Sequence, residues 1–199
     1  MDLERVVAHD AVGISDEDRE AAVLAPVITR NGDHYLLFTK RADHLGEHPG
    51  QMSFPGGGRE PSDDGLQATA LREANEEISL DPAAADIVGR LDDIRTVTRY
   101  SVRPYVARIP DAEYTPDERE VAEIAVLAVE DLIDLDNYES ERRDHPHYGD
   151  IRLHFFTVNG YTVWGATARI LVQLLQLATG WQMPEEVDRE VDPDADLPV

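Results

Sequence analysis

The chain has 199 residues, enough for one domain with a sizeable hydrophobic core. It carries 41 Asp and Glu against 18 Lys and Arg, a formal net charge of -23. This balance leaves no basic footprint for duplex nucleic acid, and the absence of cysteine excludes disulfides and thiolate metal sites. No apolar run approaches the ~20 residues that span a bilayer, and the N-terminus lacks the order of a signal peptide. We therefore expect a soluble cytoplasmic protein with no nucleic-acid or membrane partner.

The first sixty residues predict a short helix followed by strands. Residues 1–20 are polar and indicate a frayed N-terminal helix. Residues 21–30 (AAVLAPVITR) predict a strand, in which Pro26 indicates an edge position or a bend. Asn31-Gly32 predicts a hairpin to a second strand over 34–40, because both turn residues accept positive φ. After a loop over 41–50 and a short alternation over 51–54, the glycine-rich stretch 55–58 is expected to lack regular structure.

The most informative stretch is an acidic helix expected over residues 64–80. Its first residue, Asp64, can act as the N-cap, with Gln67 at the reciprocal capping position. At ~100° per residue, three carboxylates then fall within a quarter to a third of the helix circumference: Glu73, Glu76 and Glu77. Hard divalent cations bind several converging carboxylate oxygens, so this face is a candidate Mg²⁺ or Mn²⁺ site. The alternative is a solvated acidic face, which is common in so acidic a chain.

The second half of the chain predicts further strands and one long helix. Strands are expected over 87–91, 94–100 and 102–109, and 121–129 is ambiguous because its alanines favour helix and its valines favour strand. A charged loop over 114–119, a helical turn over 130–135 and a polar loop over 138–150 surround these segments. A second Asn-Gly hairpin joins 151–158 to 161–164, and an amphipathic helix covers 166–178. We expect a helical extension (1–20), a mixed α/β domain (21–182) and an acidic disordered tail (183–199).

The stretch 58–80 closely resembles the Nudix signature, G-x5-E-x7-R-E-U-x-E-E-x-G-U, in which U is a bulky aliphatic residue. Arg72-Glu73 match its RE pair and Glu76-Glu77 match its EE pair. Two positions depart from it. Asp64 stands where the signature has Glu, which puts in doubt the brace to the motif arginine, and Ser79 stands where the signature has the glycine of a tight turn.

The resemblance extends upstream, where LLFTKRADHLGEHPGQMSFPGG is similar to the coenzyme A pyrophosphatase branch of the Nudix hydrolases. In that branch another residue often replaces the first glutamate of the signature, and an aspartate lies nearby. Asp63 would be that aspartate here. Later landmarks of the branch are V-x-P-x-V at 102–106, E-V at 120–121 and W-G-x-T-A at 164–168. Gly46 departs from it, since the branch commonly has arginine there.

The resemblance implies a Nudix α/β/α sandwich around a mixed β-sheet, with 121–129 as a strand. It implies metal-dependent hydrolysis of coenzyme A or its derivatives to 3′,5′-ADP and a phosphopantetheine, with Mg²⁺ or Mn²⁺ as the ion. The metal ligands would be Glu73, Glu77, a supporting Glu76 and the Gly57 carbonyl. The catalytic residues would be Glu76, Glu120 as the base from a loop, and Arg72 as a brace. The substrate would contact Lys40, Arg41, His48, Gln51 and Ser53.

Two other functions remain open at this point. One is a Nudix hydrolase of another diphosphate, such as ADP-ribose or a dinucleoside polyphosphate. The other is a non-catalytic Nudix-fold binding module, although such proteins usually lose motif glutamates. Either way the partner is a small molecule, and the chain is a monomer or a homodimer.

The acidic excess and the single lysine, Lys40, also lead to a hypothesis about environment. Screening by salt suppresses repulsion among the carboxylates, so we expect stability to rise with salt concentration. The free energy of unfolding measured from low to molar KCl should increase steadily. Stability that does not change across that range would contradict adaptation to high salt.

Overall fold

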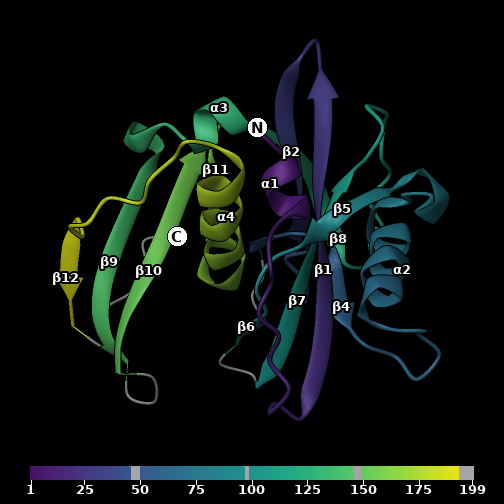
Figure 1. The fold of residues 1–199 in the computed structure, drawn as a ribbon, viewed down its shortest axis with the longest axis horizontal. Coiled ribbons are helices and arrows are strands. Elements are labelled where there is room, and N and C mark those ends of the chain that lie inside the picture. The colour runs from purple at the N-terminus through teal and green to yellow at the C-terminus, as the bar shows by residue number, and fades with distance from the viewer. Residues whose placement is uncertain (46–49, 97–98, 146–148, 193–199) are drawn as a thin grey trace.

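The computed structural model describes residues 1–45, 50–96, 99–145 and 149–192 (Figure 1). Eight strands form the first sheet, sheet A, along the path β3-β2-β1-β7-β5, with β4 paired to β1, β6 to β7 and β8 to β2. Among the described residues of sheet A, only the β1–β7 pair is parallel, so the sheet is mixed. Its strands are β1 (Arg19–Arg30), β2 (Asp33–Arg41), β3 (Met52–Ser53), β4 (Gly56–Gly58), β5 (Asp86–Arg90), β6 (Ile94–Arg95), β7 (Tyr100–Arg108) and β8 (Val121–Ala128).

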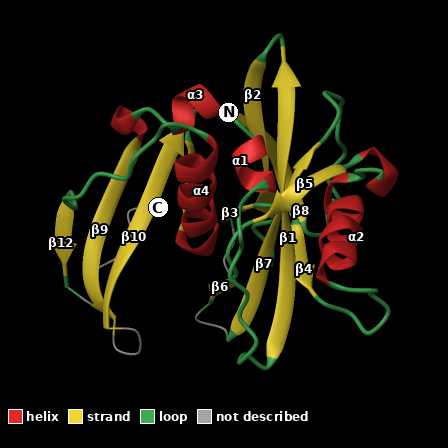
Figure 2. Ribbon diagram, in the orientation of Figure 1, coloured by secondary structure: helices red, strands yellow, loops and turns green. Residues whose placement is uncertain are grey.

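A second, four-stranded sheet, sheet B, has the order β11-β10-β9-β12 and lies on the other side of a long helix (Figures 1 and 2). Its strands are β9 (Tyr138–His145), β10 (Gly149–Val158), β11 (Tyr161–Trp164) and β12 (Arg189–Val191). The helices are α1 (Glu4–Val7), α2 (Leu66–Ile78), α3 (Val129–Leu132) and α4 (Gly165–Ala178), with single 3₁₀ turns at Pro82–Ala84 and Leu135–Asn137. In the described part of the chain, no helix is long and apolar enough to cross a membrane.

The core has two parts because strand β1 is buried on both faces. Alternate residues such as Ala25 and Val27 join the larger cluster with α4 and sheet B. Their neighbours Leu24 and Ile28 join the cluster under α2. A near-continuous apolar run is what a strand covered on both faces requires. Helices therefore cover both faces of sheet A, and the expected α/β/α sandwich around a mixed sheet is confirmed.

Both predicted Asn-Gly hairpins are confirmed. Asn31 and Gly32 have φ of 53° and 96°, and Arg30 pairs with Asp33 across the turn. The second turn, 159–160, likewise has two positive φ values and joins β10 to β11. Segment 121–128, ambiguous from composition, is the strand β8. The helix expected over 166–178 is α4, whose inward leucines and isoleucine are buried.

The expectation that Pro26 marks an edge position was wrong, because β1 lies in the middle of sheet A. Beside β7 the strand is paired throughout, whereas on its other side β4 pairs with residues 21–23 and β2 with residues 27–30. On that side the Leu24 N–H donates to the Pro55 carbonyl. Pro26 therefore falls between the two partners, where a missing N–H removes no ladder hydrogen bond.

The glycine-rich stretch was also predicted wrongly, since Gly56–Gly58 form strand β4 antiparallel to β1. A Cβ on Gly56 would lie 2.6 Å from Val23 Cα, so the strands approach more closely than any side chain allows. The N-cap expected at Asp64 is wrong as well. Helix α2 begins at Leu66, and the cap position is Gly65 with φ 139° and no side-chain cap.

The polar loop expected over 138–150 is instead the hairpin of β9 and β10. Its many charges hid the alternation, because several are satisfied by ion pairs such as Arg143–Glu141 at 2.5 Å rather than by solvent. Beyond the expected domain boundary, β12 adds a parallel strand to β9, so 189–191 are ordered rather than disordered. At the other end, α1 covers only Glu4–Val7 of the expected helix, and β1 already begins at Arg19.

His154 on β10 gives the fold a testable pH dependence. The pKa of His154 is lowered from 6.5 to about 4, chiefly by burial and in addition by the charges of Arg152 and Arg169. The unfolded chain therefore takes up a proton near pH 6.5 and the folded chain only near pH 4. The stability that the neutral imidazole contributes is complete above pH 6.5 and is lost as the pH falls from 6.5 towards 4, by roughly 2–3 kcal/mol at pH 4.5.

Urea unfolding of the wild type and of His154→Asn at pH 7 and pH 4.5 measures this loss. The loss between the two pH values should be larger in the wild type, because asparagine does not titrate. Equal losses in the two proteins would show that His154 does not contribute to acid sensitivity.

A candidate metal centre on the acidic helix

Helix α2 lies flat on sheet A because every fourth residue on one side is small or aliphatic. Leu66, Ala70, Ala74 and Ile78 are all buried against the strands. Glu73 and Glu77 each precede one of these buried residues, so their side chains emerge at the edge of the contact with sheet A. The apolar stripe thus fixes two carboxylates beside the glycine strand β4.

The glycines of β4 let the backbone approach these carboxylates. A Cβ on Gly57 would lie 2.6 Å from the carboxyl carbon of Glu73, so any side chain there would displace the Glu73 carboxylate. One residue earlier, the Gly56 N–H donates to Glu77 Oε2 at 3.4 Å. Two carboxylates therefore lie against the glycine strand, where carboxylate and backbone oxygens come close together, which is an arrangement of oxygen donors that suits a hard cation.

Both carboxylates carry an electrostatic cost in the absence of a cation. The pKa of Glu77 is raised to about 8, chiefly by burial and in addition by the charges of Glu73 and Glu120. Burial likewise raises the pKa of Glu73, against the lowering effect of Arg72. A divalent cation would reverse this repulsion, so the donor set fits such an ion.

Within the described residues, no three Asp, Glu or His side chains are gathered closely enough to hold a metal by themselves. Mg²⁺ ordinarily keeps several waters and is bound through one or two carboxylates plus substrate oxygens. A site of two glutamates and a backbone carbonyl therefore suits an ion whose coordination the substrate completes.

Arg72 is the brace of the site, and its partner is Asp63 rather than Asp64. Its Nε and Nη2 donate to the two Asp63 oxygens at 3.0 and 3.1 Å, and Nη2 also donates to the Gly58 carbonyl at 3.0 Å. Its Nη1 donates to Glu73 Oε1 at 3.0 Å. The Arg72 guanidinium holds the pKa of Asp63 well below its usual range. The motif arginine therefore ties the glycine strand, the preceding loop and a candidate ligand together.

Glu76 is placed differently from its neighbours. Its side chain is more than half exposed, and Oε2 accepts a hydrogen bond from Arg72 Nη1 at 3.0 Å. It therefore lies at the rim of the acidic face, where it can support a second ion or hold the brace.

A distant loop brings Glu120 to the same place. The Asp117 N–H donates to the carbonyl of Glu77 at 2.9 Å, which anchors the loop at the end of α2. Ser79, at the turn after the helix, adopts φ 57° and donates to the Thr115 carbonyl, so a left-handed serine makes the turn. The Glu120 charge acts on both Glu73 and Glu77. The structure thus brings the sequence-predicted base candidate next to the helix carboxylates.

The upstream block reaches the same centre through Arg41. Arg41 pairs with Val121 in the register of β2 and β8, and the Ala42 N–H donates to the Glu120 carbonyl at 2.9 Å. The charge of Arg41 also lowers the pKa of Glu77. Lys40 precedes it on β2, opposite Glu123 of β8. The Ser53 hydroxyl is engaged with Thr39 Oγ1 at 3.1 Å, a contact that fixes β3 to β2. His48 lies outside the described residues.

Gln51 points elsewhere, towards the start of α4. Its Nε2 would lie 3.5 Å from a Cβ on Gly165. Sequence reasoning also missed the hydrogen bond from the Tyr161 hydroxyl to Glu123, which joins sheet B to sheet A near Lys40. No local pattern could reveal that pair, because its residues lie on strands of different sheets.

The comparisons with known proteins agree with this geometry. Residues 18–148 match the model of the NUDIX domain. The chain is 40% identical over 160 residues to a protein of Enterobacter sp. strain 638 described as the uncharacterized Nudix hydrolase NudL. That match covers 78% of this chain and 81% of the relative. A relative with the same description from Escherichia coli O7:K1 is 38% identical over the same length.

Among solved structures, a NUDIX hydrolase from Alicyclobacillus acidocaldarius resembles the chain with a TM-score of 0.50 at 20% identity. The likeness covers 60% of this chain and 83% of that one. A Caenorhabditis elegans Ap4A hydrolase gives a TM-score of 0.48 over 58% of this chain and 83% of its own, at 20% identity. At this identity the first likeness supports the fold alone.

The two neighbouring aspartates allow a matched test of the brace. Asp63→Asn removes the charge that holds Arg72, which should lower turnover about tenfold or more through misplaced Glu73, and should lower the unfolding midpoint. Asp64→Asn makes the same change one residue away and should leave both unchanged. Steady-state kinetics and thermal unfolding of the two variants measure these effects. A larger loss of turnover or stability in Asp64→Asn than in Asp63→Asn would contradict the structure.

Proposed function

The chain belongs to the Nudix hydrolase family, and from that premise we propose that it hydrolyses the diphosphate bond of coenzyme A or its derivatives. The products would be 3′,5′-ADP and 4′-phosphopantetheine, or the acylated form of the latter. Nudix hydrolases cleave nucleoside diphosphate linkages and generally use divalent cations such as Mg²⁺ or Mn²⁺. The finer assignment is supported by the resemblance of the block over 40–54 to the coenzyme A branch, together with one contact: the Ala42 N–H, next to Arg41, donates to the carbonyl of the base candidate Glu120 at 2.9 Å.

We assign the cation to Glu73, Glu77 and the Gly57 carbonyl, with Glu76 in support. When bound, the cation would neutralise the diphosphate and polarise its phosphorus towards attack by water. Arg72 keeps Glu73 aimed at this point through its bonds to Asp63 and Gly58. Each of these ligands sits on a rigid helix or strand, which is how a precise site is held.

The base candidate is Glu120, whose charge acts on both helix glutamates. Its carboxylate would accept the proton of the attacking water, a role that side chains of this kind supply for about 10²–10⁴-fold in rate. Lys40 and Arg41 would bind the phosphates, with Gln51, Ser53 and His48 as further contacts from the same block. A cytoplasmic location and a monomeric or homodimeric state also remain proposals.

A substrate panel tests the assignment. Purified protein with Mn²⁺ should cleave coenzyme A to 3′,5′-ADP and 4′-phosphopantetheine, identified by mass spectrometry, faster than it cleaves ADP-ribose or diadenosine polyphosphates. Preferential cleavage of ADP-ribose or a dinucleoside polyphosphate would contradict the assignment of coenzyme A as the substrate. No cleavage of any diphosphate would favour a binding module.

The same assay separates the metal ligands from other acidic residues. Glu77→Gln should cut turnover by about 10²-fold or more while the fold stays intact, since the carboxylate charge is lost without a change of shape. Glu130→Gln makes the same change on an exposed position of α3 and should be neutral. Full activity in Glu77→Gln would overturn the metal assignment.

A further inference from the structure

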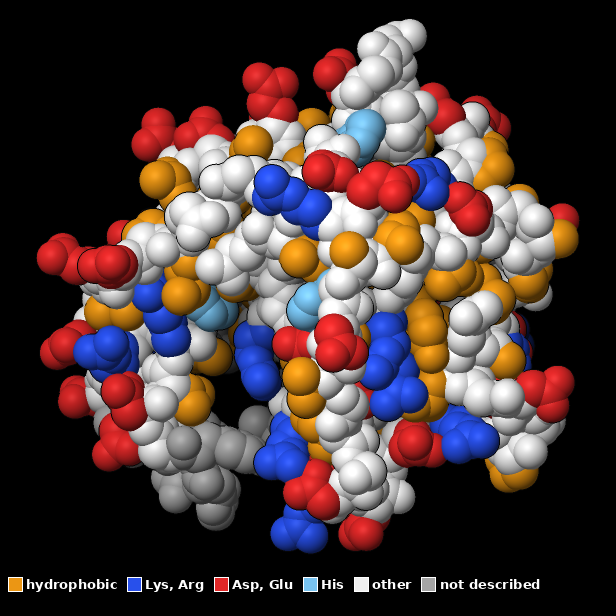
Figure 3. All heavy atoms as spheres, in the orientation of Figure 1, with side chains coloured by type: hydrophobic (Ala, Val, Ile, Leu, Met, Phe, Trp, Pro, Cys, Tyr) orange, Lys and Arg blue, Asp and Glu red, His pale blue; other side chains and the backbone are white. Residues whose placement is uncertain are grey.

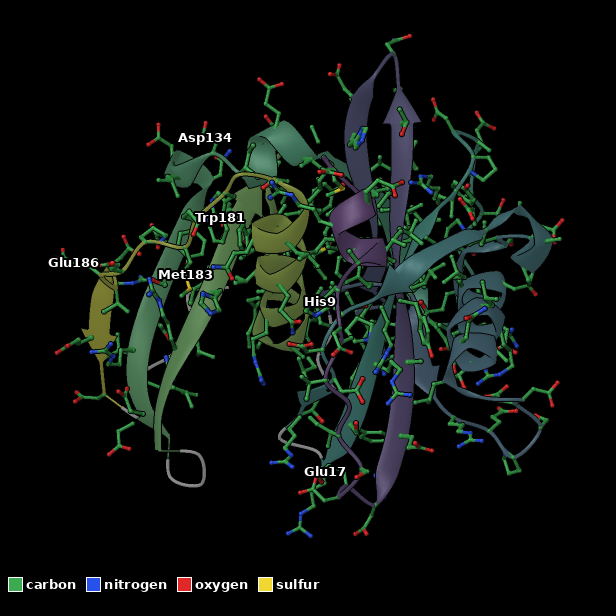
Figure 4. The ribbon with its side chains drawn as sticks, viewed as in Figure 1. His9, Glu17, Asp134, Trp181, Met183 and Glu186 are labelled. Carbon is green, nitrogen blue, oxygen red and sulfur yellow. The ribbon has the colours of Figure 1, made fainter. Side chains whose placement is uncertain are left out.

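Carboxylates cover so much of the surface of this chain that exposure alone assigns no role to any one of them. In Figure 3, Asp and Glu side chains are scattered around the outline of the molecule. Asp134 and Glu186, labelled in Figure 4, lie at its edge and away from α2. An acidic residue with a role in the candidate site should instead be recognised by the bonds that tie it to that site.

Asp117 builds the turn that leads from the loop after β7 into β8. Its Oδ1 accepts a hydrogen bond from the Arg119 N–H at 3.1 Å. Its carbonyl accepts hydrogen bonds from the N–H groups of Glu120 and Val121, at 2.9 and 2.8 Å. Aspartate favours such turns because its short side chain bonds to the backbone two residues further on. The backbone on which Glu120 sits is therefore shaped by Asp117.

The carboxylate of Asp117 is itself held in place. Arg119 Nε donates to Oδ1 at 2.9 Å and Nη2 donates to Oδ2 at 2.5 Å, a two-point contact that fixes the orientation of the carboxylate. The Asp117 side chain is 22% exposed and that of Arg119 is 87% exposed. Because so exposed an ion pair contributes little to stability, its main effect is on the geometry of the turn.

Two hydrogen bonds anchor this turn to the end of α2. The Asp117 N–H donates to the Glu77 carbonyl at 2.9 Å. Two residues earlier, the Thr115 carbonyl accepts a hydrogen bond from the Ser79 hydroxyl at 3.2 Å. The backbone of Glu120 is thus joined to that of Glu77 by two successive hydrogen bonds, through Asp117. The position of the base candidate relative to a candidate metal ligand therefore depends on this turn.

The segment after β2 holds the same turn from another side. The Ala42 N–H donates to the Glu120 carbonyl at 2.9 Å. His44 Nε2 donates to the Arg119 carbonyl at 3.1 Å. Glu120 nevertheless stays exposed, so its carboxylate can meet water. A loop is an imprecise support for a catalytic group unless its own contacts fix it, and here contacts on two sides do so.

We propose that Asp117 is a positioning residue for Glu120: its turn holds the Glu120 carboxylate at the α2 glutamates, where it accepts the proton of the attacking water. This inference rests on the proposed function, in which Glu120 is the base, but it does not require coenzyme A as the substrate. A base must lie within hydrogen-bond reach of the proton that it accepts. A displacement of about 1 Å can cost up to about 10²-fold in rate.

Kinetics of two Asp117 variants test this role with the diphosphate that the wild type cleaves. Asp117→Ala removes the side-chain acceptor and should lower kcat about tenfold or more, with KM and Mn²⁺ affinity within about twofold of the wild type. Asp117→Asn keeps an oxygen for the Arg119 N–H and should restore kcat to within about threefold of the wild type. Glu118→Ala is the matched control, because Glu118 is an exposed acid in the same turn, and it should leave kcat unchanged.

A double-mutant cycle separates positioning from a general structural defect. In the Glu120→Gln background, Asp117→Ala should lower kcat no further, because the residue that Asp117 positions no longer accepts a proton. Hydrogen exchange at the Glu120 and Val121 amides gives a readout without turnover. Asp117→Ala should speed both exchange rates about tenfold, since the turn that holds these amides is loosened.

Three results would overturn the proposal: an unchanged kcat in Asp117→Ala, an equal fall of kcat in the two backgrounds, or unchanged amide exchange. Full activity of Glu120→Gln would overturn it as well, because the base would then lie elsewhere. Failure of the proposed function is seen in the wild type instead. A wild type that cleaves no diphosphate refutes that function and the catalytic role of the turn together, whereas cleavage of another diphosphate changes the substrate alone.

Discussion

The candidate site depends on the close approach of helix α2 to the three-glycine strand β4. Gly56 lies against the backbone of Val23 in β1, so a side chain there would push the strands apart, and a side chain on Gly57 would displace the Glu73 carboxyl. The closeness lets the Gly56 N–H reach Glu77, and it lets Arg72 reach the Gly58 carbonyl. Glycine weakens a strand by its conformational entropy. Glycine nevertheless occupies these positions because it allows backbone and carboxylate oxygens to come close together.

The same closeness concentrates negative charge. Glu73 and Glu77 stand one helical turn apart, a like-charge spacing that costs a bare helix ~0.2–0.5 kcal/mol. Burial adds to the cost of the two charges, and two arginines offset part of it, Arg72 at Glu73 and Arg41 at Glu77. The acidic helix is therefore under electrostatic strain by construction. A cation site requires carboxylates close together, whereas a stable surface helix requires them apart. The sequence of this helix places them close together.

Much of this could be predicted from local sequence, and the failures have physical causes. The Asn-Gly turns and the periodicity of α4 depend on neighbouring residues only, so they were predicted correctly. The charged strand β9 was missed because its charges are satisfied by partners elsewhere in the fold. The cap at Asp64 was wrong because helix α2 begins one residue later than that cap requires, with Gly65 at the cap position and no side-chain cap. Similarly, Pro26 could not be placed without knowing that β1 changes partners beside it.

The parallel pairing of β1 with β7 joins segments roughly eighty residues apart in the chain. The hairpin to β2, strand β4 and helix α2 all belong to the loop that this pairing closes. Local contacts can form early, but β1 pairs with β7 only after the chain has lost the conformational entropy of closing this loop. Folding of sheet A is therefore governed by a long-range step, and during synthesis it cannot be completed until β7 has left the ribosome. Until then the apolar faces of β1 and α2 are exposed to other chains, so the pairing also sets the interval in which aggregation competes with folding.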